Sequence, residues 1–308
     1  MRLYRTQATI SASGRQFSRE GGGTALAPKK KQRAVALPKS LRAIIRALHR
    51  RIPSDRRYLL PHGELLRADA LEFLTALPRG CADLVFLDPP FNLGKAYGRK
   101  GPSADLLEET LYYEYMGSVL SQCADVLRPG GALYLYHLPR WGIKFGGLLG
   151  TRVAFRHWIA ISMKNGFARG KRLYPAHYAL LFFTKGEPRV FRRPKVEPLR
   201  CHKCHELARD YGGYTRYVQR GINLSDVWDD LSPVRHRNRK HRTANELTIE
   251  IPRRVVRISG VRGGIFVDPF AGAGTSLVAA TEAGMWLLAA DRDRQSCELM
   301  HRRLSATD

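Results

Sequence analysis

The chain has 308 residues, of which 44% are hydrophobic, so it can bury the core of one large domain or two small ones. Its 52 lysines and arginines against 27 acidic residues give a net charge of +25, far beyond what solubility requires. Such a surplus predicts a polyanionic partner, nucleic acid first and an anionic membrane surface second. No apolar run approaches the roughly 20 residues of a bilayer-spanning helix, so we expect no membrane segment.

Five cysteines, scattered and odd in number, indicate a reducing compartment rather than a disulfide framework. Cys201 and Cys204 form a C-x-x-C pair, which is half of a zinc site. The sequence has no second pair of this kind, although His236 and His241 could complete the site. Unmetallated surface residues are the favoured interpretation, and we therefore expect no bound metal.

Residues 1–57 are expected to form a basic, largely disordered tail with 15 lysines and arginines and 2 acidic residues. The stretch "EGGGTALAPKKKQR" is rich in glycine, proline and lysine and has no periodicity. Residues 40–51 have apolar positions at helical spacing. They predict either a basic helix on nucleic acid or a solvated helix that lies on the domain.

From residue 65 the pattern changes to alternating helices and strands. Helical periodicity predicts helices at 68–77 and 114–127, the second of them ended by the Pro/Gly terminator "RPGG". Runs of β-branched and aromatic residues bounded by turn residues predict strands at 83–88, 132–138, 157–164 and 177–186.

The alternation resumes after an irregular and basic region at 186–245. Residues 245–259 predict a helix with Pro252 in its first turn. "GIFVDPF" predicts a strand, "AGAGT" a turn, "SLVAATEAG" a helix and "MWLLAAD" a further strand. Alternating strands and helices predict an α/β fold with a mostly parallel sheet and helices on both faces.

The turn within "FVDPFAGAGTSLVAA" (266–280) has the features of a ligand site. Its glycines let the backbone turn tightly and let a ligand approach without a Cβ in the way. The next helix begins with free N–H groups, and Asp291 ends the next strand, where a carboxylate can accept both hydroxyl hydrogens of a ribose. This order predicts a site for an adenosine-bearing ligand. The alternative is a tight turn that only packs a helix on a strand.

Two motifs resemble those of the amino-methyltransferases that act on DNA. "DPFAGAGT" resembles their S-adenosylmethionine (AdoMet) loop, and "DPPF" resembles their catalytic tetrapeptide, D/N/S-P-P-Y/F/W. The catalytic motif precedes the loop by about 180 residues, an order that resembles the β-group of these enzymes. The resemblance covers roughly residues 60–304 and implies a Rossmann-like methyltransferase fold with circularly ordered motifs.

The resemblance implies a role for each residue of the catalytic motif. An exocyclic amine conjugated to a base is a poor nucleophile, so acceptors must hold its hydrogens and turn the nitrogen lone pair toward the methyl group. Asp88 accepts one hydrogen and the carbonyl of Pro89 accepts the other, because Pro89 and Pro90 fix φ and hold that carbonyl outward. Phe91 offers a ring on which a flipped base can stack. The alternative is a proline-rich strand exit with a capping aspartate.

The implied AdoMet site combines residues near the start of the resembling region with residues near its end. Asp69 stands where the family has an acid near the adenine, although Ala68 replaces the usual glycine before it. The implied AdoMet-binding residues are Asp69, Asp268, Pro269, Phe270, Gly272, Gly274, Thr275 and Asp291. We therefore expect a catalytic half at 58–188, a target-recognition and linker region at 189–245, and an AdoMet-binding half at 246–308.

Residues 189–257 hold 17 lysines and arginines and 8 acidic residues, interleaved with tyrosines and a tryptophan. Arginine and lysine serve phosphates and guanine edges, and aromatic rings can wedge where a base leaves the stack. We interpret this region as the target-recognition surface, and ordinary solvated surface is the alternative for each residue. The expected DNA-binding residues are Arg216, Arg235, Arg237, Arg239, Lys240 and Arg242.

The implied function is site-specific transfer of a methyl group from AdoMet to the exocyclic amino group of a flipped base in double-stranded DNA. Asp88 favours adenine N6, and cytosine N4 is the alternative. An RNA or protein-glutamine target is a further enzymatic alternative, and a non-catalytic nucleic-acid binder, which the intact motifs disfavour, is an alternative of another class. We expect a cytoplasmic, nucleoid-associated protein that does not bind membranes. The resemblance also allows a homodimer and a cognate restriction nuclease as partners.

Overall fold

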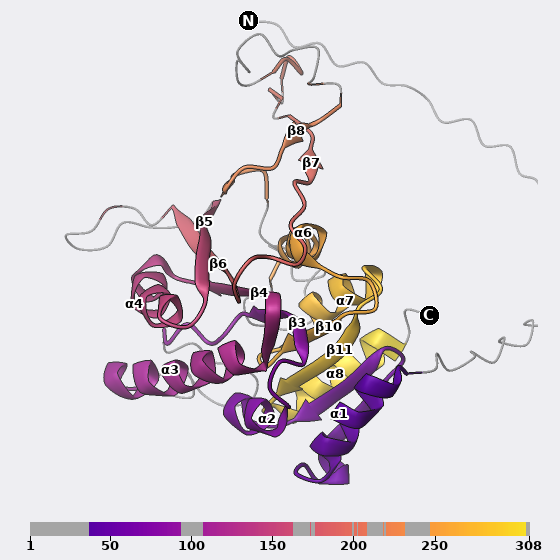
Figure 1. The fold of residues 1–308 in the computed structure, drawn as a ribbon. Helices are drawn as coiled ribbons and strands as arrows, with labels where there is room; N and C mark the ends of the chain where they lie inside the picture. Colours follow the sequence, from indigo (N-terminus) through magenta and orange to yellow (C-terminus); the bar gives the residue numbers. More distant parts are fainter. Residues whose placement is uncertain are drawn as a thin grey trace, which may run out of the picture. The chain divides into compact units, whose positions relative to one another are not determined.

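The computed structural model describes residues 37–93, 107–162, 173, 176–198, 200–201, 203–207, 218, 220–231 and 247–305. Within these residues nine strands form one sheet in the order β1-β2-β11-β10-β3-β4-β6-β5-β9 (Figure 1). The strands are β1 (Arg57–Leu60), β2 (Gly63–Arg67), β3 (Ala82–Leu87), β4 (Leu127–His137), β5 (Ala154–Ser162), β6 (His177–Thr184), β9 (Val227–Trp228), β10 (Ile265–Asp268) and β11 (Trp286–Asp291). A separate antiparallel pair is formed by β7 (Lys195–Val196) and β8 (Ile222–Asn223).

The centre of the sheet is parallel. β2, β11, β10, β3 and β4 run in one direction, whereas β1 and β6 run against their neighbours. β6 lies between β4 and β5, so the chain inserts one antiparallel strand into the second half of the sheet. The α/β fold with a mostly parallel sheet that the sequence predicts is confirmed.

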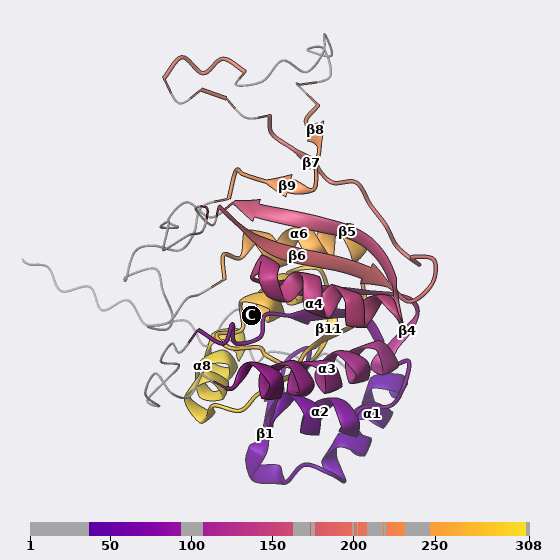
Figure 2. The same ribbon diagram turned by 90° about the vertical axis from the view of Figure 1, so that its left-hand side faces the viewer.

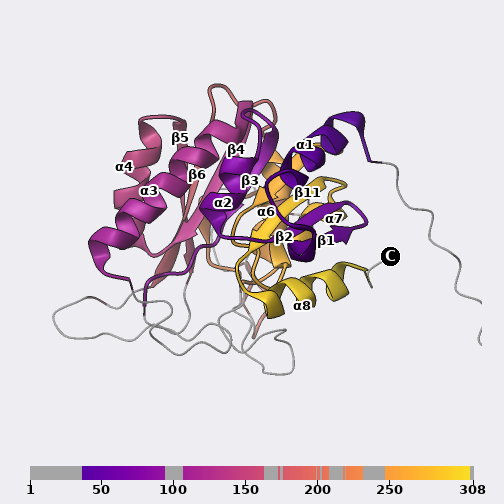
Figure 3. The ribbon, with the colours of Figure 1, turned by 90° about the horizontal axis from the view of Figure 1, so that it is seen from below.

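Helices cover both faces of the sheet (Figures 2 and 3). The helices are α1 (Lys39–His49), α2 (Ala70–Ala76), α3 (Glu109–Val126), α4 (Pro139–Gly150), α6 (Glu250–Ser259), α7 (Thr275–Glu282) and α8 (Arg294–Ser305). The first four share one buried cluster with the sheet, and the last three share the other. Along β3, Val85 and Leu87 join the first cluster, and Leu84 and Phe86 join the second. A strand buried on both faces reads as a continuous apolar run, which explains the pattern before Asp88.

The N-terminal helix belongs to the folded unit. Leu41, Ile44, Ile45 and Leu48 of α1 are buried in the first cluster, and His49 Nε2 lies 2.7 Å from a carboxylate oxygen of Glu64. Of the two alternatives for 40–51, the structure therefore has the helix that lies on the domain. The boundary that we expected at residue 57 differs from the structure, because residues 37–57 pack with the sheet, and residues 1–36 lie outside the described part of the chain.

β4 begins earlier than the sequence pattern predicts. It starts at Leu127, directly after α3, and includes the "RPGG" stretch that we interpreted as a terminator. The register with β3 shifts here, so the strand start is irregular. The amide of Gly130 donates to the Lys185 carbonyl at 2.7 Å, and the Lys185 amide donates to the Gly131 carbonyl at 3.0 Å. These bonds hold the glycines against the segment that follows β6.

The sequence pattern predicts no helix at 139–150, where the structure has α4. Four glycines in this stretch lower its helix propensity. Packing favours one of them, because a Cβ on Gly142 would lie 3.0 Å from the Trp158 ring on β5. The close approach of the backbone to the sheet explains the glycine at this position.

A half-buried ion pair ties α6 to the residues that follow the edge strand β9. Arg254 on α6 donates through Nη1 to Asp230 Oδ1 at 2.9 Å, and its second nitrogen bonds the other oxygen. The same guanidinium lies 5.1 Å from the centre of the Trp228 ring. This contact anchors the end of the 189–245 region on the AdoMet-binding half that the sequence predicts.

Candidate active site

Four neighbouring strands bring four carboxylates to one edge of the sheet. Asp291 and Asp268 are the last residues of β11 and β10, Asp88 follows β3 directly, and Asp69 lies two residues beyond β2. These strands are adjacent and parallel in the order β2-β11-β10-β3, so their carboxyl ends meet at the same edge. Open α/β sheets bind ligands at this edge.

The glycine turn after β10 has the conformation that its sequence predicts. Gly272 has a φ of 53° and Gly274 a φ of 77°, both in the left-handed region that glycine tolerates. The amide of Gly274 donates to the Ala271 carbonyl at 2.7 Å, which closes the turn, and α7 begins at Thr275. No side chain caps α7, and the N–H groups of an uncapped first turn are suited to binding a ligand.

Asp268 lies inside this turn. The side chain is 1% exposed, Oδ1 accepts from the Phe270 amide at 2.9 Å, and Oδ2 accepts from the Ser276 hydroxyl. Burial raises the pKa of its carboxyl to about 7, and the charges of Asp88 and Asp291 act in the same direction. We expected Asp268 to bind AdoMet; the structure places its carboxylate where it holds the turn, between Pro269-Phe270 and the start of α7.

The Asp268 carboxyl should make stability depend on pH. Because the folded-state pKa is raised, the folded chain keeps a proton that the unfolded chain releases above about pH 4. Stability should therefore fall as pH rises toward the folded-state pKa of about 7, by at most about 1.4 kcal/mol per pH unit from this group. The side chain of Asp268→Asn stays neutral at every pH. The free energy of unfolding in urea should therefore fall for the wild type between about pH 4 and about pH 7, and fall less for the variant. Identical pH profiles for the two proteins would rule out the buried titration.

Asp291 connects the turn to the next strand. Its Oδ2 accepts from the Gly272 amide at 2.8 Å, and its Oδ1 accepts from the Asp293 amide at 2.8 Å. An ionised carboxylate has about four acceptor positions, so these bonds are compatible with the ribose contact that we expect. The side chain is half-buried, which keeps it accessible from the edge.

Asp69 is fixed by contacts from two helices. Its Oδ1 caps α2 by accepting from the Leu71 amide at 2.9 Å, and its Oδ2 accepts from the Tyr115 hydroxyl of α3 at 2.9 Å. Burial, and next the Asp69 charge, raise the pKa of Tyr115, so this hydroxyl stays a donor. Tyr115 is 46 positions away in the sequence, and no local pattern identifies it.

The residues at this edge fit AdoMet. Thr275 Oγ1 is buried at the start of α7 and has no hydrogen-bond partner among the described residues, so the turn keeps a polar atom for a ligand. The left-handed glycines present backbone without Cβ atoms, and the row of carboxylates favours a ligand that carries positive charge. AdoMet has a cationic sulfonium, a protonated amine and a ribose diol, each of which this edge can complement.

The catalytic motif lies beside an aromatic cluster. Asp88 is half-buried. Burial raises the pKa of Tyr136 and of Tyr178, and the Asp88 charge is the second cause that raises both pKa values. Phe91 is 8% exposed and stacks on the His137 ring at 4.9 Å between centroids, with both tyrosine rings within 5.8 Å. We expected Phe91 to present a ring to a flipped base. That role stays a prediction, and a base would meet Phe91 as part of this cluster.

The expected DNA-binding residues lie outside the described part of the chain: Arg216, Arg235, Arg237, Arg239, Lys240 and Arg242. His236 and His241 lie outside it as well. In the described residues 200–201 and 203–207 the Lys203 amide donates to Cys201 Sγ at 3.4 Å, and backbone hydrogen bonds from Cys204 and Lys203 lower the pKa of the Cys201 thiol. The described residues contain no group of three histidine, cysteine or acidic side chains that could hold a metal.

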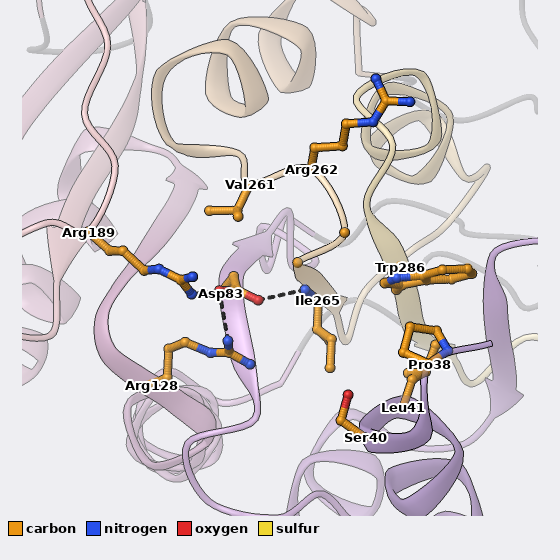
Figure 4. Close-up of a pocket in the computed structure, with 12 residues that line it drawn as sticks. Pro38, Ser40, Leu41, Asp83, Arg128, Arg189, Val261, Arg262, Ile265 and Trp286 are labelled. Atoms are coloured by element: carbon orange, nitrogen blue, oxygen red, sulfur yellow. Dashed lines mark hydrogen bonds and ion pairs between the residues drawn. The ribbon is translucent and has the colours of Figure 1, made fainter.

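A cavity of about 160 Å³ lies at the opposite edge of the sheet (Figure 4). Asp83, near the start of β3, accepts from Arg128 and Arg189 at 3.0 Å each and from the Ile265 amide at 2.7 Å. Trp286, the first residue of β11, closes another side. Because amino ends of parallel strands line this cavity, it lies away from the four carboxylates, and its charges hold β3, β4 and β10 together.

Replacing Asp83 with asparagine should destabilise the fold by about 2 kcal/mol. The amide oxygen can still accept from Ile265, but the buried charge between the two arginines is lost. Urea unfolding measures the difference. Unchanged stability would show that the half-exposed Arg189 and the largely buried Arg128 are equally well solvated without their partner.

These features define a class: an α/β protein with a methyltransferase-type sheet and an adenosine-ligand site at its carboxyl edge. A family model described as DNA methylase (N6_N4_Mtase) matches residues 82–302, so the chain belongs to this family. The resemblance that the two motifs carry is therefore confirmed.

Individual relatives agree with the family. The chain is 35% identical over 251 residues to the type II methyltransferase M.BamHI of Bacillus amyloliquefaciens. The match covers 80% of this chain and 58% of M.BamHI, so the chain spans little more than half the length of that relative. Solved structures share the fold as well. A SAM complex of M1.HpyAVI has a TM-score of 0.53 at 16% identity, covering 78% of this chain and 98% of that one.

The second solved structure is the PvuII DNA methyltransferase, described as cytosine-N4-specific, with a TM-score of 0.56 at 14% identity. The alignment covers 80% of this chain and 87% of that one. At these identities both structures support the fold alone, and they agree with the expected methyltransferase architecture. Among the described residues, no helix combines the length and apolarity that crossing a bilayer requires.

Proposed function

We propose that the chain transfers the methyl group of AdoMet to the exocyclic amino group of a base in double-stranded DNA. The observation that carries this proposal is the adjacency of the two motifs. β10, which leads into the glycine turn, pairs in parallel with β3, which leads into Asp88. A ligand held at the turn and an amine held at Asp88 therefore share one strand edge. The SAM complex of M1.HpyAVI, which has the same fold, supports AdoMet as the ligand.

The chain's own residues account for the chemistry of the amine. Asp88 accepts one hydrogen of the amino group, and the carbonyl of Pro89 accepts the other. These two acceptors turn the nitrogen lone pair out of conjugation with the base ring. AdoMet supplies, when bound, an electrophilic methyl group on sulfur. As positive charge develops on nitrogen, Asp88 stabilises it, and the carboxylate is placed for this before the reaction begins.

Asp88 favours adenine N6 as the target, because the resemblance associates aspartate at this position with adenine-specific members. Cytosine N4 is the alternative, since both amines need the same two acceptors. Enzymatic digestion of methylated DNA followed by mass spectrometry separates the products. N6-methyladenine is the expected nucleoside, and N4-methylcytosine would reassign the target without moving the site.

The test of the activity is incorporation of a labelled methyl group from AdoMet into double-stranded DNA. Wild-type protein should label DNA, and RNA of the same sequence should stay unlabelled. Label in RNA or protein alone would overturn the DNA assignment. No label in any of them, with AdoMet binding intact, would favour the non-catalytic nucleic-acid binder.

The partners and location follow from the same proposal. We infer that the 189–245 region recognises the target sequence and that the protein works on the nucleoid in the cytoplasm. A homodimer and a cognate restriction nuclease are further partners that this proposal allows. Gel filtration with light scattering tests the dimer.

Residues 1–36 should strengthen DNA binding without setting its specificity. They carry 8 lysines and arginines and 1 acidic residue. A chain that starts at residue 37 keeps α1 and the packed unit intact. The DNA affinity of this shortened chain should depend less steeply on salt. The slope of log affinity against log salt concentration should become shallower by about 0.9 for each phosphate that residues 1–36 neutralise. The methylated sequence should be unchanged. An unchanged slope would exclude residues 1–36 from the DNA interface.

A further inference from the structure

A chain of three hydrogen-bonding groups reaches the backbone of the catalytic motif. The Tyr112 hydroxyl, on the first turn of α3, lies 2.6 Å from the carbonyl oxygen of Pro90. It also lies 2.7 Å from Nε2 of His137, the last residue of β4. The other ring nitrogen of His137, Nδ1, lies 2.8 Å from the amide nitrogen of Leu138.

These contacts have one consistent direction. The Leu138 amide can only donate, so Nδ1 of His137 accepts and carries no proton in the neutral ring. Nε2 then carries the hydrogen and donates to the Tyr112 oxygen. A carbonyl can only accept, so the Tyr112 hydroxyl donates to Pro90. Burial, together with the Arg140 charge, lowers the pKa of His137 to about 3, which keeps the ring neutral at working pH.

Packing fixes the two side chains. Tyr112 is 3% exposed and His137 is fully buried. The Tyr112 ring lies 4.8 Å from the Trp141 ring in an edge-to-face arrangement. A hydroxyl and an imidazole buried this deeply cannot exchange their partners for water, so the chain of bonds is held.

The consequence falls on the catalytic motif. A fixed Pro90 carbonyl sets the peptide plane that leads into Phe91, whose ring stacks on His137. On the other side, Asn92 has a φ of 54° and exchanges two hydrogen bonds with the Leu107 backbone, of 2.8 and 3.0 Å. The segment from Asp88 to Asn92 is therefore anchored at two points, by Tyr112 on the first turn of α3 and by Leu107 just before that helix.

We propose that Tyr112 and His137 are positioning residues that hold the Asp88–Phe91 segment in the geometry required for methyl transfer. This inference rests on the proposed function, because it assigns the motif to the reacting amine. Neither side chain touches the amine; both act through the Pro90 carbonyl. A device of this kind affects turnover more than the binding of AdoMet, whose loop lies on β10.

The main test is Tyr112→Phe, which keeps the ring and removes the hydroxyl. Under single-turnover conditions the methylation rate should fall roughly 10–100-fold, while the AdoMet Kd changes less than about threefold. Tyr113→Phe is the matched control, because Tyr113 is the next residue on α3 and stacks on Phe145. It should keep the wild-type rate. A full rate in Tyr112→Phe, or a parallel loss of AdoMet binding, would overturn the proposal.

His137 provides a second test that does not depend on the first variant folding. His137→Gln retains a donor that can reach Tyr112, whereas His137→Leu does not, so the glutamine variant should be at least about fivefold faster. The double variant His137→Leu/Tyr112→Phe should have a methylation rate close to that of the slower single variant. Both substitutions break the same chain of hydrogen bonds, so their effects on the rate should not add. Equal rates for the two His137 variants would contradict the proposal. If Asp88→Ala is inactive while Tyr112→Phe is fully active, the positioning role fails and the proposed function stands.

Discussion

Asp88→Ala is expected to lower the single-turnover rate of DNA methylation by roughly 10²–10³-fold, which corresponds to about 3–4 kcal/mol of transition-state stabilisation. The base amine is far too weak an acid to lose its proton beforehand at neutral pH. The carboxylate therefore acts mainly as positive charge develops on nitrogen, so AdoMet and DNA binding should change little. Rapid-quench measurement of methyl incorporation, with calorimetry for AdoMet, separates these quantities.

Asp88→Ser sharpens this expectation. Serine keeps an acceptor but loses the charge and shortens the reach, so part of the activity should survive, with more methylation of cytosine than the wild type gives. Asp83→Asn serves as a control from the other end of the same strand, because Asp83 lies at the opposite sheet edge and affects stability only. A wild-type rate in Asp88→Ala would remove this residue from the mechanism.

Asp291→Ala should weaken AdoMet binding by roughly 10–100-fold, about 1.4–2.8 kcal/mol. The substitution removes the acceptor that we assign to the ribose and also the bond that holds the Gly272 amide in the turn. Both losses act on the bound ligand, so the Kd from calorimetry should rise.

Asp293→Asn is the matched control for Asp291→Ala. Asp293 accepts from the Ser296 amide at 2.9 Å at the start of α8, and asparagine can keep that bond. The control should bind AdoMet like the wild type. If Asp291→Ala bound AdoMet normally, the acid at the end of β11 would only support the turn.

The elements that carry the site could be predicted because their signals are local. β3 and β10 are continuous apolar runs that end on an acid and a proline, and the glycines after β10 need left-handed backbone. The order of the sheet explains why the motifs converge although about 180 residues separate them. The methyl-transfer chemistry was predicted from the family resemblance, because the spacing of the glycine turn and Asp291 alone fits any adenosine-bearing ligand.

The partners of these acids could not be predicted, because tertiary packing brings them together. Tyr115 meets Asp69 across 46 positions, and His137 meets Tyr112 across 25. "ALYLYHL" has the pattern of an ordinary buried strand, and nothing in it predicts that its histidine contacts Tyr112 and Phe91. The sequence pattern does not predict α4, because its glycines disfavour a helix. Gly142 is explained only by the Trp158 ring, which the fold brings close to it.

The decisive experiment is single-molecule sequencing of DNA from cells that express the protein, compared with DNA from cells that express Asp88→Ala. Methylated amino groups, N6-methyladenine first and N4-methylcytosine as the alternative, are expected at one recurring sequence in the first sample. The same positions should be unmodified in the second. No modified amine in the first sample, or the same pattern in both, would exclude methyl transfer to DNA through Asp88.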